Sequence, residues 1–76
     1  MSEPRASKAF GWIVEINRPA PLLFNVAEPI KAQAVEAVRR RIPEAKGAKV
    51  EAKTPLSSHT VYGLLRMKRG QVAKIE

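Results

Sequence analysis

Residues 10–26 read FGWIVEINRPAPLLFNV, and the alternation within this stretch decides the fold. Apolar residues occupy every second position in two runs: Phe10, Trp12, Val14 and Ile16, then Leu22, Phe24 and Val26. A period of two, rich in aromatic and β-branched residues, is typical of strands that bury one face. The segment between the runs includes Pro19 and Pro21, which lack a backbone N–H and fit a turn. The stretch therefore predicts a β-hairpin.

The chain after the hairpin predicts a helix that begins at Pro29 and ends near Ile42. Proline suits the first helical position, and Pro43 disfavours helical geometry at the residue before it. The apolar residues of this segment recur at helical spacing: Ile30, Ala34, Val35, Val38 and Ile42. The run Arg39–Arg41 then falls in the last turn, where positive charge suits the exposed carbonyl groups.

The second half of the chain predicts a strand, a short helix and a final strand. Residues 48–53 alternate, and Pro55 is expected to end this strand. Ser57 or Ser58 can cap the helix that follows. The apolar side of this helix would hold Val61, Leu64 and Leu65. Residues 71–75 form the last predicted strand, after a left-handed turn at Gly70.

The predicted fold class is α+β, a small mixed four-stranded sheet in the order β-β-α-β-α-β with two helices on one face. Helical crossovers favour parallel pairing, whereas the first hairpin is antiparallel, so we expect both kinds of pairing in the sheet. The residues expected to be buried together are Trp12, Val14, Phe24, Val35, Val38, Val50 and Leu64.

The 76 residues allow a single domain, which we assign to residues 9–76. Residues 1–8 are polar and aperiodic, and we predict a flexible N-terminal arm. Cysteine is absent, which excludes disulfides and thiolate metal sites. No apolar run approaches the roughly 20 residues of a membrane span, and the N-terminus does not resemble a signal peptide. The expectation is a cytoplasmic protein with no membrane partner.

Catalytic and cofactor motifs are missing from the sequence. His59 is the single histidine, and the chain contains no Asp. The hydroxyl residues around His59 lack the G-x-S-x-G turn that exposes a nucleophilic serine. The scattered glutamates match no zinc-ligand spacing, and neither glycine-rich phosphate motif occurs. We therefore predict a protein that is not an enzyme and that uses no cofactor and no metal.

Positive charge is the feature that points to a function. Fourteen Lys and Arg outweigh seven Glu, which gives a net charge of +7. A charge of this size attracts anionic partners. The residues predicted as candidates for contact with an anion fall in two clusters, Arg39, Arg40 and Lys46, and Arg66, Lys68 and Arg69. Successive arginines on a helix point about 100° apart, so the run Arg39–Arg41 is not expected to aim at one ligand.

Two functional hypotheses follow. The first is a small non-enzymatic binding module with a basic surface, whose partner is nucleic acid or another anionic partner such as an acidic protein. The alternative is a protein–protein interaction module or homo-oligomer, joined at a sheet edge or through Ile13 and Leu23. Phe10, Trp12 and Phe24 are predicted to be core residues rather than a stacking platform, and Tyr62 stands alone. Convergence of the two basic clusters on one face would favour the first hypothesis, and an uncovered apolar patch would favour the second.

Overall fold

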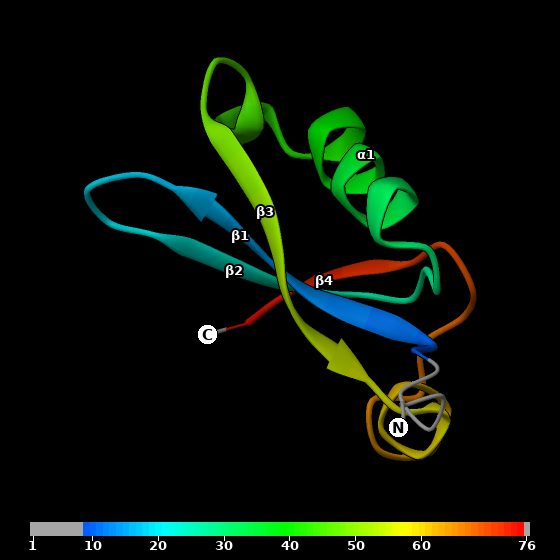
Figure 1. Ribbon diagram of the computed structural model, residues 1–76. Coiled ribbons are helices and arrows are strands. Elements are labelled where there is room, and N and C mark those ends of the chain that lie inside the picture. The colour runs from blue at the N-terminus through cyan, green and yellow to red at the C-terminus, as the bar shows by residue number, and fades with distance from the viewer. Residues whose placement is uncertain (1–8, 76) are drawn as a thin grey trace, which may run out of the picture.

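A four-stranded antiparallel sheet with one α-helix packed against it forms the body of the protein in the computed structural model (Figure 1). The structure describes residues 9–75, and the predicted arm at 1–8 lies outside them. The elements are β1 (Gly11–Asn17), β2 (Leu22–Val26), α1 (Lys31–Arg41), the 3₁₀ turn η2 (Pro43–Ala45), β3 (Lys49–Leu56), the π-type helical segment η3 (His59–Leu64) and β4 (Val72–Lys74). The predicted α+β class is confirmed, and the succession of four strands and two helical segments agrees with the prediction, with the π-type η3 in place of the second α-helix and η2 as an addition.

The predicted hairpin is confirmed by its register. Val14 of β1 pairs with Phe24 of β2, and Ile16 pairs with Leu22. Residues 18–21 form the loop between them, so both prolines of this loop lie outside the ladder. Because paired residues project to the same face, the alternating apolar residues of the two strands gather on one side of the sheet.

The prediction of a mixed sheet is wrong, because every neighbouring pair of strands is antiparallel. The strand order is β3-β1-β2-β4. Helix α1 connects β2 to β3, and these two strands do run parallel, but β1 lies between them. The crossover therefore joins two parallel strands that are not neighbours in the sheet. For this reason no two directly paired strands are parallel.

Helix α1 covers the face of the sheet that carries the alternating apolar residues. Val14, Phe24, Val38 and Val50 are buried as predicted, together with Ile16, Val26 and Ala34. Trp12 and Val35 are only half-buried, and they pack at the margin of this cluster. The indole Nε1 of Trp12 donates a hydrogen bond to the carbonyl of Pro29 at 3.0 Å, which ties β1 to the start of the helix.

The second helical segment differs from the prediction in its form and in its position. Leu65 N–H donates to the carbonyl of Thr60, five residues earlier, so the turn is wider than an α-helical turn. The α-helical spacing then fails, and Leu64, a predicted core residue, is 67% exposed. Of the two serines predicted as caps, Ser58 occupies the cap position of η3 without a side-chain cap hydrogen bond, and the Oγ of Ser57 accepts a hydrogen bond from Thr60 N–H at 3.2 Å.

Segment η3 packs on the opposite side of the sheet from α1, which corrects the prediction of two helices on one face. Its buried residue Val61 belongs to a cluster with Ala27, Leu56 and Met67, against which Ile13 and Ala73 pack. Their strand neighbours Val14 and Val72 belong instead to the cluster under α1. Successive strand residues project to opposite faces, so the two clusters lie on opposite sides.

Strand β3 continues through Pro55 to Leu56, although the proline was expected to end it. β3 lies at an edge of the sheet, where a missing N–H is tolerated because one side of the strand has no partner. The pairing with β1 contains an irregularity at Ile13 and Val14, so Lys53 has no partner opposite it in the ladder.

Replacing Val38 by alanine tests the packing of α1. Val38 is completely buried between helix and sheet, so Val38→Ala should lower the free energy of unfolding by about 1–3 kcal/mol through lost burial and a small cavity. Chemical denaturation measures the loss. Gln33→Ala, an exposed change in the same helix, is the control and should shift the midpoint little. Equal midpoints for the two variants would contradict the described packing.

At Gly11 the backbone of β1 lies close to β2 and to the side chain of Val61. A Cβ at this position would lie 2.5 Å from the carbonyl oxygen of Val26 and 2.8 Å from Cγ2 of Val61. Gly11→Ala should therefore destabilise the protein by about 1–3 kcal/mol, as overpacking does elsewhere. Gly63→Ala is the control, because its Cβ would meet the exposed His59 ring, which can move. The midpoints of thermal unfolding of the two variants are compared. A Gly11→Ala midpoint equal to that of the unchanged protein would contradict the close approach of the backbone at this position.

Candidate anion-binding surface

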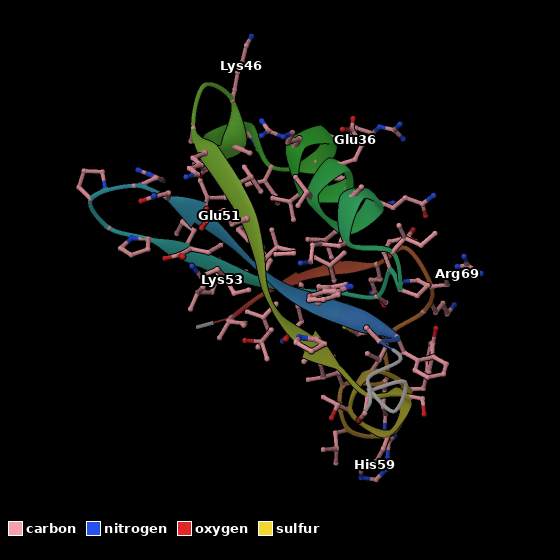
Figure 2. All side chains as sticks on the ribbon, in the orientation of Figure 1. Glu36, Lys46, Glu51, Lys53, His59 and Arg69 are labelled. Atoms are coloured by element: carbon pink, nitrogen blue, oxygen red, sulfur yellow. The ribbon has the colours of Figure 1, made fainter. Side chains whose placement is uncertain are left out.

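A basic hollow lies off the C-terminal end of α1. Its volume is about 370 Å³, and the residues that line it are Arg39, Arg40, Arg41, Ile42, Pro43, Ala45, Lys46 and Gly47. Pro43 and the turn η2 reverse the chain after the helix, and Gly47 adopts a left-handed φ of 76° that leads into β3. This reversal brings Lys46 back to the arginines, and Figure 2 shows Lys46 at this end of the molecule.

All three successive arginines line the same hollow, which the sequence did not predict. Their directions around the helix axis differ by about 100°. The hollow lies beyond the end of the helix rather than along its side, however, so residues on every side of the last turn reach its border. The predicted candidates Arg39, Arg40 and Lys46 are therefore brought together, with Arg41 as a fourth cation.

The charges around the basic hollow are only partly neutralised. Arg40 lies 4.0 Å from Glu36, an exposed pair one helical turn apart. Within residues 9–75, no ion pair involves Arg39, Arg41 or Lys46. No glutamate of the described residues 9–75 lines the hollow. Exposed carbonyl groups at the helix end carry partial negative charge, so any bound anion would be held by the side chains rather than by the helix dipole.

The second predicted cluster, Arg66, Lys68 and Arg69, lies on the segment between η3 and β4. Met67 is buried within it, which anchors the segment while its basic neighbours stay exposed. Two hydrogen bonds fix the turn: Gly70 N–H donates to Ala27 O at 2.8 Å, and Lys68 N–H donates to Gln71 Oε1 at 2.9 Å. Gly70 has a φ of 84°, which confirms the predicted left-handed turn.

The two basic clusters do not merge into one continuous face. A second hollow of about 270 Å³ lies between them and is lined by Glu28, Gln33, Glu36, Ala37, Arg40, Arg41 and Gly70. This hollow has mixed charge, because Glu28 and Glu36 line it together with the two arginines. Figure 2 shows Lys46 and His59 at opposite ends of the molecule, with Arg69 between them. The clusters are therefore separate sites joined by a neutral passage.

The lysines of β3 are engaged locally. Lys49 and Lys53 each lie 3.3 Å from Glu51, and Lys53 also lies 3.6 Å from Glu15. The hydrogen bond from Lys53, followed by that from Lys49 and by their charges, lowers the pKa of Glu51. The same pairing with Glu51 raises the pKa of Lys53. These cations are thus less available to an outside anion than those of the basic hollow.

An apolar patch on η3 was missed by the sequence analysis. Tyr62 is 44% exposed, Leu64 is 67% exposed and Leu65 is 38% exposed. The Tyr62 ring packs edge-on against Phe10 with ring centroids 6.4 Å apart. The two leucines were expected in the core because an α-helical period was assumed, and Gly63 within the run was the one sign of an irregular helix. Of the apolar residues predicted for an outer face, Leu23 is 38% exposed and Ile13 is half-buried.

His59 is exposed at the start of η3, and its ring lies beside Gly63. The neighbouring Ser57 hydroxyl donates to Thr60 Oγ1 at 3.1 Å rather than to the imidazole. Among residues 9–75, no three histidine or carboxylate side chains gather as metal ligands do. No helix in this part of the chain combines the length and apolarity that crossing a membrane requires.

Comparison of the chain with protein-family models, with curated proteins and with solved structures finds no match. The surface of the protein is therefore the basis for its proposed function. The basic hollow and the apolar patch on η3 are the two surface features that set this molecule apart from a uniformly charged domain.

The charged cluster on β3 gives a prediction for Glu51. Removing the charge with Lys53→Met should raise the pKa of Glu51 toward the ordinary carboxyl value, because the largest cause of its depression is lost. NMR titration of the Glu51 side chain measures this change, and Lys74→Met is the control. Because the folded pKa is lowered, the stabilisation by this carboxylate is present above its unfolded pKa and is lost as pH falls through the lowered value. An unchanged titration would show that the pair does not persist in solution.

Proposed function

We propose that the protein is a small non-enzymatic binding module that holds nucleic-acid phosphates in the basic hollow at the end of α1. The observation that carries the proposal is the lining of this hollow, which contains Arg39, Arg40, Arg41 and Lys46 and no acidic residue. A cytoplasmic location, as expected from the sequence, belongs to the same proposal.

Arginine and lysine side chains around a shallow hollow suit phosphate groups for two reasons. The guanidinium group presents several donors in a plane that matches phosphate oxygens, and lysine supplies a mobile point charge. Neutralising phosphates also releases condensed counterions, which favours binding at low salt. Contacts of this kind position a protein on the backbone and do not read base sequence, so we expect weak sequence preference.

By the criterion set from the sequence, the separation of the two basic clusters and the exposed Tyr62, Leu64 and Leu65 favour the protein–protein interaction alternative, whereas the lining of the basic hollow supports nucleic acid. For a homo-oligomer joined at the β3 edge of the sheet, the chemistry of that strand is unfavourable. Its edge carries Lys49, Lys53 and Pro55 together with a pairing irregularity, and these features discourage a second strand from adding there. An acidic protein partner would use the same cations as nucleic acid. Competition by poly-glutamate distinguishes them, because a phosphate-selective hollow should prefer nucleic acid at equal charge concentration.

A triple variant tests the basic hollow. Changing Arg39, Arg41 and Lys46 to alanine should weaken duplex DNA binding at about 50 mM salt and flatten the log–log salt dependence by up to about 2.7, if each contacts one phosphate. Fluorescence anisotropy over a salt series measures both effects. The fold should persist, because exposed charges add little stability.

The matched control removes the same number of charges elsewhere, at Arg18, Lys49 and Lys74. A specific hollow predicts that this control loses much less affinity than the hollow variant. Equal losses would mean that binding depends on net charge alone, and the hollow would have no special role. Absence of binding by the unchanged protein to both duplex and single-stranded nucleic acid at low salt would end the proposal.

A further inference from the structure

The apolar patch on η3 adjoins the second basic cluster. Tyr62, Leu64 and Leu65 are exposed, and Arg66, Lys68 and Arg69 follow them directly in the chain. Figure 1 shows η3 as a separate coil at the end of β3, away from α1. Exposed apolar side chains grouped on one segment next to cations are candidates for a contact surface.

Arg66 follows Leu65, the C-cap residue of η3, and has the left-handed backbone conformation with which helices commonly end. Its φ is 52°, and it is the one non-glycine residue in the described part of the chain with a positive φ. Glycine would adopt this conformation without steric cost, as Gly47 and Gly70 do at their turns. Arginine at this position places a charged side chain directly after the exposed apolar residues Leu64 and Leu65.

We propose that this segment gives the protein a preference for single-stranded nucleic acid, with an unpaired base stacked on Tyr62 and the adjoining phosphates held by Arg66, Lys68 and Arg69. The inference rests on the proposed function and deepens it, because it names the form of nucleic acid. Bases in a duplex are stacked on one another, and only an unpaired base can lie flat against a protein ring.

The surroundings of Tyr62 fit a stacking position. Phe10 contacts the ring edge-on with an interplanar angle of 80°, which holds its orientation while nearly half of the side chain stays exposed. Leu64 and Leu65 add exposed apolar surface on the same segment, where the rest of a base or its sugar can pack. The exposed cations Arg66, Lys68 and Arg69 follow Tyr62 within seven residues of the chain, and they supply positive charge for adjoining phosphates.

Substitution of Tyr62 by leucine and by phenylalanine tests the inference, with oligo(dT) of about 12 nucleotides and a duplex of equal length as probes. Tyr62→Leu should weaken oligo(dT) binding about tenfold, as loss of one stacked base does, and should leave duplex binding unchanged. Tyr62→Phe keeps the ring and should bind both probes like the unchanged protein. The hollow variant should weaken both probes, which separates this inference from the proposed function.

Three results would overturn the inference. One is an affinity for oligo(dT) that Tyr62→Leu leaves unchanged, and another is an equal loss on both probes. The third is an equal loss of poly-glutamate binding, which would assign the segment to an acidic protein partner. Should Tyr62→Leu fail to fold, NMR of the unchanged protein replaces it. The chain has a single tyrosine, whose ring signals should shift upfield with oligo(dT) and not with duplex.

Arg66→Gly separates a structural role from a binding role. Glycine relieves the positive φ, so the midpoint of thermal unfolding should stay equal or rise. Oligo(dT) affinity should nevertheless fall severalfold at low salt, because one phosphate contact is lost. Higher stability together with unchanged affinity would show that Arg66 does not contact the nucleic acid.

Discussion

Strand β1 pairs along both of its sides and packs on both of its faces, and the rest of the structure depends on this double role. It joins β2 on one side and β3 on the other. Val14 and Ile16 enter the cluster under α1, while Ile13 packs against the cluster formed with η3. Gly11 lets the backbone approach β2 and Val61 at the end of the strand. Both helical segments are therefore positioned relative to one strand.

The parts of the fold that could be predicted from sequence are those set by local patterns. The hairpin follows from strict alternation around two prolines, and α1 follows from its apolar spacing and from Pro43. Pairing between distant strands could not be predicted, because a helical crossover fixes strand direction but not which strand lies in between. Leu64 was assigned to the core by an α-helical period, and the wider turn of η3 moves it to the surface.

The candidate site was predicted in its residues and not in its shape. Arg39, Arg40 and Lys46 were identified by charge alone, and a count of charges contains no information about where glutamates lie. In the structure Glu15 and Glu51 engage the lysines of β3, and Glu36 lies on the side of α1. The lining of the basic hollow combines the last turn of α1 with Lys46, and no glutamate of residues 9–75 takes part in it. The apolar patch could be identified only from the structure, because a regular α-helix would have buried the same leucines.

Strand β4 is the least secured element of the sheet. It pairs with β2 through three residues only, and two further hydrogen bonds flank this pairing, from Ile75 N–H to Leu23 O and from Ala27 N–H to Gln71 O. Amide exchange should therefore be faster in this strand than in β1, because local opening of an edge costs less than global unfolding. The segment that carries Arg66, Lys68 and Arg69 precedes this strand, with Met67 buried as its anchor. A partner that orders this segment would slow amide exchange in β4 as well. Exchange in β4 would then report binding at the basic segment, although β4 itself is not the contact surface.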